Sequence, residues 1–159
     1  MSRAKAHAGF SLIELLIVVA IIGIVAAIAI PNLLASRRAA YEGSAQSSLR
    51  TISTCEATYQ ATTGMGDYGD LTALGNITLT DRVLASGVKS GYRFAATPTA
   101  VGVRPAMYYA TAVPVITSGL SQTGTRRFGV SEDGIMHGDN TLTVYPDEAT
   151  LKASATLGN

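Results

Sequence analysis

The sequence predicts an α+β fold in which a long N-terminal helix packs on a small antiparallel sheet of three or four strands. Two observations indicate the helix: residues 15–30 contain no polar side chain, and the segment after Pro31 is amphipathic with helical spacing. A third indicates the sheet, because short strand-like runs separated by Gly, Pro and Asp follow Gly64. The chain of 159 residues has room for one modest globular domain besides the apolar part.

The composition excludes several classes of protein. The net charge of +1 gives no strong attraction to an anionic polymer, so we do not expect nucleic acid as a partner. Cys55 is the single cysteine, so neither an intramolecular disulfide nor a thiolate metal cluster can form within the chain. Charged residues make up 14% of the chain, which suits a protein that hides much of its surface against copies of itself.

The apolar segment, residues 10–30, is long enough to cross a membrane. At 1.5 Å per residue a helix over this segment spans about 30 Å, the thickness of a bilayer core. It differs from an ordinary secretory signal peptide, because the sequence after it continues with helical character. Basic residues flank it on both sides, Arg3 and Lys5 before it and Arg37 and Arg38 after it, so the charges leave its orientation undecided.

One carboxylate stands near the start of the apolar segment. Glu14 has no basic residue beside it, and a carboxylate at the centre of a membrane span costs roughly 2.5–3.5 kcal/mol on the insertion scale. Without Glu14, a single-pass anchor for a periplasmic or extracellular domain would be the simplest interpretation. With it, the segment is expected to do more than anchor.

Residues 9–14 read Gly-Phe-Ser-Leu-Ile-Glu and resemble the processing motif of type IV prepilins. In that family a short basic leader, here residues 1–9, ends in Gly, and the following Phe becomes the mature N-terminus. A Glu four residues after the Phe and an unbroken apolar run complete the motif. Gly23 and Pro31 also fall where the family places its helix-weakening Gly and Pro. The resemblance is strong over residues 9–35 and architectural beyond them.

The resemblance implies how the chain is processed. Prepilin peptidase, an inner-membrane aspartyl protease, would cut between Gly9 and Phe10 on the cytoplasmic side, and the new amine of Phe10 would be methylated. The prepilin would lie in the inner membrane with its N-terminus in the cytoplasm, and the mature chain in an extracellular pilus. Arg37 and Arg38 then lie on the outer side, which suggests contacts in the assembled state.

The function implied by the resemblance is that of a structural subunit and not an enzyme. The chain would form a homopolymer, a helical filament held by the N-terminal helix, with adhesion, motility or DNA uptake following from the filament. The implied partners are prepilin peptidase, the inner-membrane assembly platform and the cytoplasmic assembly ATPase. One alternative is a major pseudopilin of a type II secretion system, which forms a periplasmic pseudopilus. A membrane-anchored enzyme or binding domain is another, against which the lack of a catalytic constellation argues.

The resemblance also gives Glu14 a role in assembly. The Phe10 amine of an incoming subunit would lie at the depth of a neighbour's Glu14, and pairing offsets much of the cost of burying the two charges. Pairing of Phe10 with Glu14 of the same chain is the competing arrangement. Between Gly23 and Pro31 the helix is weakest, because proline lacks an N–H donor and glycine lowers helix propensity. The resemblance implies local unwinding of this stretch in the filament.

Five parts are expected along the chain: a leader at 1–9, a transmembrane and assembly helix at 10–31, an amphipathic helix at 32–62, an αβ-loop at 63–90, and an antiparallel sheet with the C-terminal region at 91–159. The amphipathic helix presents one face with residues three or four apart, namely Tyr41, Ala45, Ser48, Ile52, Cys55 and Tyr59. Cys55 is therefore read as a small buried hydrophobe. Polar residues lie between these positions, among them Glu42 and Glu56.

The elements expected after the long helix are short. A short helix is expected at 81–85, and strands at 91–97, 107–113, 127–131 and 141–145. The pair Asp133-Gly134 favours a tight turn between the last two strands. Alternation along the first strand makes Tyr92 and Phe94 core residues.

Oxygen-bearing residues gather in residues 132–140. Asp133, Asp139 and Asn140 are candidate calcium ligands, but the segment lacks the alternating spacing of an EF-hand loop, and solvated turn chemistry is the better interpretation. Major pseudopilins bind calcium in their C-terminal loops, so a site here would favour that alternative. We expect no cofactor, and we expect His137 on the surface of a turn rather than as a ligand.

Two further features bear on the C-terminal region. A basic patch for DNA would have to come from Lys89, Arg93, Arg104, Arg126 and Arg127. The family's usual C-terminal disulfide loop is absent, because one cysteine cannot close it. Strand pairing, tail packing, neighbouring subunits or a metal must then hold this region.

Overall fold

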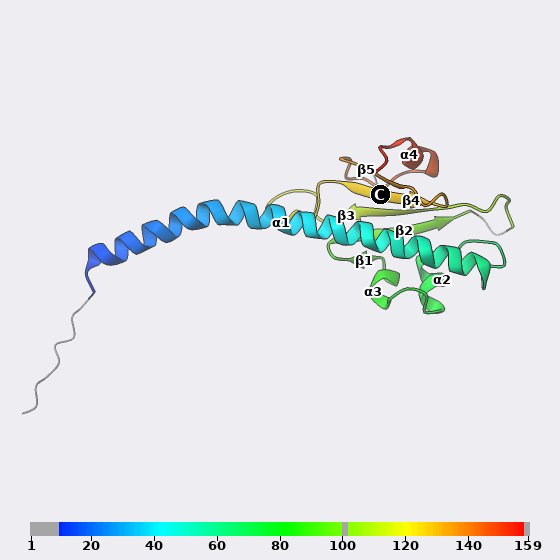
Figure 1. Cartoon of the computed structure of the whole chain (residues 1–159), viewed down its shortest axis with the longest axis horizontal. Helices are drawn as coiled ribbons and strands as arrows, with labels where there is room; N and C mark the ends of the chain where they lie inside the picture. The colour runs from blue at the N-terminus through cyan, green and yellow to red at the C-terminus, as the bar shows by residue number, and fades with distance from the viewer. Residues whose placement is uncertain (1–9, 100–101, 158–159) are drawn as a thin grey trace, which may run out of the picture. The chain divides into compact units, whose positions relative to one another are not determined.

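The computed structural model describes residues 10–99 and 102–157 (Figure 1). The chain divides into two compact units, Met1–Ser36 and Arg37–Asn159, and we call the second unit the head. Helix α1, Leu12–Ala61, contributes to both units. The predicted α+β class is confirmed: α1 is followed by a five-stranded antiparallel sheet and three short helices.

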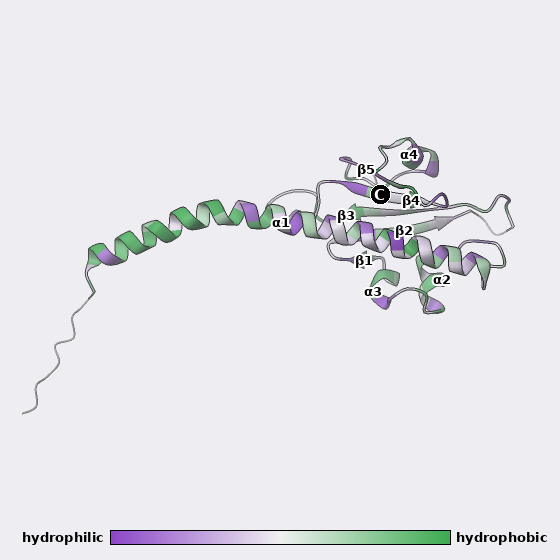
Figure 2. Ribbon diagram, viewed as in Figure 1, coloured by the Kyte–Doolittle hydropathy of each residue, from purple (hydrophilic) through white to green (hydrophobic). Residues whose placement is uncertain are grey.

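The part of α1 in the first unit exposes its apolar side chains. Ile13, Val19 and Ile28 are representative, with exposed fractions of 61%, 61% and 65%. Figure 2 shows the ribbon of this part of the helix as almost continuously green, the colour of hydrophobic residues. Within the described residues, α1 is the one helix long and apolar enough to cross a bilayer. A helix that is apolar all round and unburied needs lipid or other helices around it.

The part of α1 in the head packs by one face, as the spacing predicts. Ala45, Ser48, Ile52 and Cys55 are buried, while Tyr41 and Tyr59 at the two ends are half-buried. The stripe is wider than the prediction, because three neighbouring side chains are buried as well, namely Glu42, Leu49 and Glu56. The two glutamates lie in the interface between helix and head, and their partners are described below.

The sheet has the strand order β1-β2-β3-β4-β5, and every neighbouring pair is antiparallel. The strands are β1 Val88–Lys89, β2 Tyr92–Pro98, β3 Tyr108–Pro114, β4 Arg127–Ser131 and β5 Met136–Asp139. In the register, Phe94 lies opposite Ala112, and Ala110 opposite Val130. Figure 1 shows the sheet beside the head part of α1.

Two details of the predicted sheet are corrected. The two-residue strand β1 adds a fifth strand, and the last strand is Met136–Asp139 rather than residues 141–145. The tight turn at Asp133-Gly134 is present, with Gly134 at a φ of +73°. Because the Asp133 carboxylate accepts hydrogen bonds from Ser131 Oγ and from the Ile135 amide, the chain reverses at once and pairing resumes at Met136.

Three short helices surround the sheet. Helix α3, Arg82–Ala85, is the one predicted, and Asp81 caps it by accepting from the Leu84 amide at 2.9 Å. Helices α2, Leu71–Asn76, and α4, Glu148–Ala153, were not expected, and Asp70 and Asp147 cap them in the same way. Each contributes leucines to the buried interior, namely Leu71, Leu74, Leu84 and Leu151.

The core lies between the head part of α1 and the sheet. Tyr92 and Phe94 are buried with exposed fractions of 0% and 4%, which confirms their predicted place in the core. They are joined there by Phe128 and Val130 of β4. The tail beyond α4 runs along β5: the Leu157 amide donates to the Met136 carbonyl at 2.8 Å, and the Gly138 amide to the Ala155 carbonyl at 3.0 Å.

Candidate functional site

The N-terminal turn of α1 holds the predicted processing and assembly residues that the structure describes. Phe10 is 78% exposed and precedes the first helical residue. The Ser11 amide donates a hydrogen bond of 3.3 Å to Glu14 Oε2. Ser11 and Glu14 thus form half of a capping box, in which the glutamate three residues into the helix satisfies the amide of the capping residue. Gly9, the other side of the predicted cleavage bond, lies outside the described residues.

The capping contact was visible in the sequence and was missed. Ser-x-x-Glu ahead of an apolar run is a signature of a helix start, and residues 11–14 match it. Glu14 therefore has a local role within the single chain, besides any role toward a neighbour. Because a carboxylate has two oxygens with several lone pairs, one contact does not preclude the other.

Gly23 and Pro31 both lie inside α1, which continues through them. A Cβ at Gly23 would meet no heavy atom within 4 Å, so packing within the chain does not require glycine there. Pro31 leaves a carbonyl of the preceding turn without its usual donor, and next to it Asn32 Nδ2 donates to the Ile28 carbonyl at 3.1 Å. The unwinding expected between these residues in a filament stays a prediction.

Family comparison supports this reading of the N-terminal segment. Residues 4–30 match the family described as the prokaryotic N-terminal methylation motif. Over its N-terminal segment the chain is similar to type IV pilins. It is 47% identical over 51 residues to the type IV major pilin protein PilA of Myxococcus xanthus, a stretch covering 32% of this chain and 23% of that protein.

A second relative matches the same way. The chain is 65% identical over 40 residues to the type IV wide pilus major component PilA4 of Thermus thermophilus, covering 25% of this chain and 28% of that protein. The chain thus spans about a quarter of the length of the curated relatives it matches. No solved structure matches it. The architecture, a long apolar N-terminal helix with an antiparallel sheet, is consistent with the pilin fold that the sequence resemblance implies.

In the head, Glu42 joins α1 to the loop before β4. Its carboxylate accepts from the Thr125 amide at 2.7 Å, from Thr125 Oγ1 at 2.8 Å and from Arg126 Nε at 3.1 Å. Burial pushes the pKa of Glu42 upward, but the hydrogen bonds from Thr125 and Arg126 together outweigh it and hold the pKa below its ordinary value. The ionised form is therefore the one that the head stabilises.

Glu56 presents the opposite case. It is fully buried, and its Oε2 accepts from the Gly69 amide at 3.0 Å, whereas Oε1 has no partner. Burial, with a smaller contribution from the charge of Asp70, raises the pKa of Glu56 to about 7 against the opposing effect of the Gly69 hydrogen bond. The protonated form is favoured at mildly acid pH. Glu56 is buried although the helical spacing in the sequence placed it outside the predicted buried face of α1.

Arg127 joins β4 to β5 and to the segment that follows β5. It is 7% exposed, and its Nε and Nη2 bind the two oxygens of Asp139 at 2.8–3.1 Å. Nη1 donates to the Thr143 carbonyl at 3.0 Å, and the guanidinium lies 3.7 Å from the centroid of the Tyr145 ring. A planar fork suits this combined contact better than an ammonium group does.

The candidate calcium ligands do not come together as a ligand set. Asp139 is held by Arg127, and Asp133 closes the turn before β5. Asn140 follows β5 directly. Within residues 10–99 and 102–157, no group of three or more His, Cys, Asp or Glu side chains is placed to hold a metal ion. The expectation that no cofactor is needed stays a prediction.

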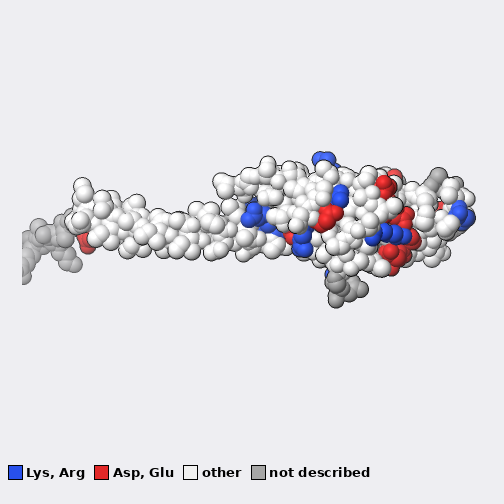
Figure 3. Space-filling model, turned by 90° about the horizontal axis from the view of Figure 1, so that it is seen from above, with Lys and Arg blue, Asp and Glu red and all other residues white. Residues whose placement is uncertain are grey.

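His137 and the basic residues are also placed by the structure. His137 was expected on the surface but is buried in β5, and its Nδ1 lies 3.0 Å from the Ser154 carbonyl oxygen, because the C-terminal tail covers that strand. Most cations of the conceivable DNA patch are paired with acids: Lys89 with Asp81, Arg104 with Asp67, Arg126 with Glu42 and Arg127 with Asp139. Figure 3 shows blue and red side chains interspersed over the head.

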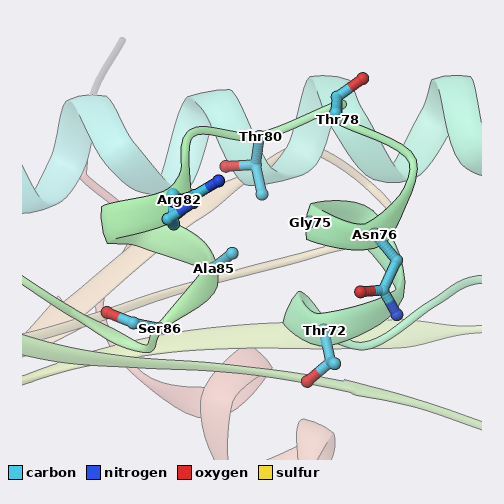
Figure 4. Close-up of a pocket in the computed structure, with 8 residues that line it drawn as sticks. All are labelled: Thr72, Gly75, Asn76, Thr78, Thr80, Arg82, Ala85 and Ser86. Carbon is cyan, nitrogen blue, oxygen red and sulfur yellow. The ribbon is translucent and has the colours of Figure 1, made fainter.

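A polar pocket of about 650 Å³ lies between α2 and α3 (Figure 4). Its lining is Thr72, Gly75, Asn76, Thr78, Thr80, Arg82, Ala85 and Ser86. The lining holds hydroxyls, one amide and one guanidinium, but neither a carboxylate nor a histidine to move a proton. It therefore offers no catalytic constellation.

Proposed function

We propose that this chain is a structural subunit of a type IV pilus, cleaved between Gly9 and Phe10 and methylated on the new amine. One coincidence carries the proposal: the segment that matches the methylation motif is also the segment of α1 that leaves its apolar side chains unburied. Each such side chain gains about 1.5–3 kcal/mol when it is fully removed from water. Before assembly a bilayer removes these side chains from water, and in a filament the helices of neighbouring subunits do so.

In the filament, Glu14 registers one subunit against the next. A buried carboxylate is stabilised by a cation at the same depth, and cleavage before Phe10 would create an amine one helical turn away from Glu14. The Ser11 amide already holds Glu14 Oε2, which fixes the carboxylate at the start of the helix. The second oxygen of the carboxylate then accepts from the amine of the incoming subunit.

The other partners follow from this function. Prepilin peptidase performs the cleavage at the cytoplasmic face of the inner membrane, and the assembly platform and its ATPase supply the work of extraction and polymerisation. The mature chain then belongs to the extracellular filament. This division of labour fits a head whose pocket between α2 and α3 has no carboxylate or histidine in its lining.

Mass spectrometry of filaments sheared from cells tests the proposal. The main component is expected to be this chain beginning at Phe10 and carrying one methyl group on its terminal amine. Retention of residues 1–9 in the mature chain would contradict the filament function, because the leader blocks the amine that pairs with Glu14.

The variant Glu14→Gln separates the ion pair from the helix cap. Glutamine at this position still accepts from the Ser11 amide, as capping boxes allow, but carries no charge for the Phe10 amine. We expect normal membrane insertion and a large loss of filaments, since an unpaired buried charge costs about 3–5 kcal/mol. The measurement is the yield of sheared filaments against the amount of chain in the membrane.

The variant Glu14→Ala is the matched comparison, because it removes the cap as well as the charge. Equal defects in the two variants would assign the loss to the charge. Filaments at normal yield from Glu14→Gln, with a defect only in Glu14→Ala, would show that the cap and not the ion pair matters.

A further inference from the structure

The loop between β3 and β4 exposes apolar side chains without any charge among them. Val115, Ile116 and Leu120 are 43%, 41% and 82% exposed. Residues 115–125 contain no acidic or basic side chain. Exposed apolar side chains in a segment without charge can contact another apolar phase at little electrostatic cost.

The base of this loop is closed by hydrogen bonds. The Thr123 amide donates to the Ile116 carbonyl at 3.0 Å, and the Ile116 amide donates to Thr123 Oγ1 at 3.2 Å. Within the tip, the Gln122 amide donates to the Gly119 carbonyl at 3.2 Å. The loop therefore presents Leu120 from a fixed base, which reduces the entropy lost when the tip is covered.

The loop lies against the first turns of the head part of α1. Arg38 Nη1 donates to Gln122 Oε1 at 3.3 Å, and Arg37 Nε donates to Tyr41 Oη at 2.7 Å. A Cβ at Gly91 would come within 2.8 Å of Thr123 and within 3.5 Å of Tyr41, so the base of the loop adjoins the helix there. Residues 31–41 contain no acidic side chain. Two guanidinium groups and an apolar tip thus share one end of the head.

The place of these arginines along α1 suggests what covers the loop. Bulky apolar side chains continue past Ile30 to Leu33 and Leu34, and Arg37 follows Leu34 by three positions, which is about 5 Å along a helix. The headgroup layer on each side of a bilayer core is about 5–8 Å thick. If the apolar segment spans the core, Arg37 and Arg38 lie where lipid phosphates are, and this holds for either orientation of the helix.

We infer that the loop of residues 115–122, together with Arg37 and Arg38, docks on an anionic phospholipid surface while the chain is anchored. Leu120 enters the boundary between headgroups and acyl chains, and the two guanidinium groups bind lipid phosphates. This combination of an apolar tip with adjacent basic side chains is the chemistry of interfacial membrane binding. The inference rests on the proposed anchoring of the chain before assembly. The lipid phosphates are then the partners of Arg37 and Arg38 while the chain is anchored in the membrane, before any contact in a filament.

A tryptophan placed at the tip tests the docking. The chain contains no tryptophan, so Leu120→Trp in the full chain reports on that position alone. The protein is reconstituted at low density into vesicles of phosphatidylcholine with phosphatidylglycerol. We expect lipids with brominated acyl chains to quench its emission and aqueous iodide to leave it largely unaffected. Met65→Trp is the control, since Met65 is 89% exposed in the loop after α1, and we expect the reverse result there.

A second variant measures what Arg37 contributes to docking on the lipid surface. Arg37→Gln is expected to lower the ratio of lipid-quenched to iodide-quenched emission about fivefold in vesicles with phosphatidylglycerol, from roughly 1 kcal/mol per basic residue near an anionic surface. The effect should disappear in phosphatidylcholine alone. Arg50→Gln, at an exposed position further along α1, should leave the ratio unchanged.

Flotation of the vesicles separates the possible failures. If the chain floats but iodide quenches Leu120→Trp as strongly as Met65→Trp, the docking is overturned and the anchor stands. If Leu120→Trp is shielded without lipid quenching, and the shielding grows with protein density, a second copy covers the loop and the inference is wrong. If the chain does not float, the proposed anchor fails and the inference fails with it.

Discussion

Replacing Arg127 by alanine is expected to lower the free energy of unfolding of the head by about 3 kcal/mol, the lower end of what breaking a buried ion pair costs. The loss has three sources: Asp139 keeps its charge without a partner, the Thr143 carbonyl loses its donor, and Tyr145 loses the cation over its ring. Asp139 is 27% exposed at its side chain, so solvent limits the cost. Urea unfolding of the full chain in detergent, followed by near-ultraviolet circular dichroism of the tyrosines, measures it.

Arg127→Lys is the conservative comparison. It keeps the charge near Asp139 but cannot reach both carboxylate oxygens and the Thr143 carbonyl together, so an intermediate loss is expected. If Arg127→Ala costs less than about 1 kcal/mol, the value of an exposed ion pair, then the C-terminal region is held by packing alone.

Glu56→Gln is expected to stabilise the head above neutral pH and to remove part of its pH dependence. Burial raises the pKa of Glu56 to about 7 from an unfolded value of 4.5. Between these two values the folded head keeps a proton that the unfolded chain has lost, so the stability of the native protein falls as pH rises through this window. At 1.36 kcal/mol per pKa unit, the full effect is about 3 kcal/mol.

Glutamine keeps the acceptor for the Gly69 amide and cannot ionise. The difference between Glu56→Gln and the native chain should therefore be small at pH 4 and grow until about pH 8. Comparing the two proteins at each pH cancels the titration of other groups. A difference that does not change with pH would mean that Glu56 does not titrate in this window.

Glu42→Gln provides a control of opposite sign. The pKa of Glu42 is below its ordinary value in the folded head, so its contribution to stability is present above the unfolded pKa and is lost as pH falls through the folded pKa. This variant should destabilise the head at neutral pH and lose its effect in acid. Opposite behaviour of two buried glutamates on one helix would assign each effect to its partners and not to burial in general.

The long helix could be predicted almost completely, because both of its signals are local. The apolar run and the three-four spacing depend only on neighbours in sequence, and the observed helix ends within one residue of the expected position. The burial of Glu42 and Glu56 could not be predicted in this way. Their hydrogen-bond donors, Thr125 and Gly69, are 83 and 13 residues away, so the periodic pattern of the helix does not reveal these contacts.

The corrections in the C-terminal region have a similar cause. Residues 141–145 carry a β-favouring composition, but the turn at Gly134 starts the last strand at Met136, and Tyr145 is drawn to Arg127 instead. His137 is buried because the tail returns over β5, an arrangement set by tertiary contacts. The cap between Ser11 and Glu14 is different, since its signature was present in the sequence.

The two edges of the sheet determine whether copies of this protein can pair through their strands. Along β5, the tail occupies backbone groups that would otherwise be open, through the bonds at Met136 and Gly138. The opposite border ends in β1, a strand of two residues whose Lys89 is tied to Asp81. Unpaired edge strands are the usual templates for β-aggregation, and edges that are short, charged or covered suppress it. Both edges therefore leave few open backbone groups for strand pairing between copies of this chain, and under the proposed function contacts between copies fall to the helix.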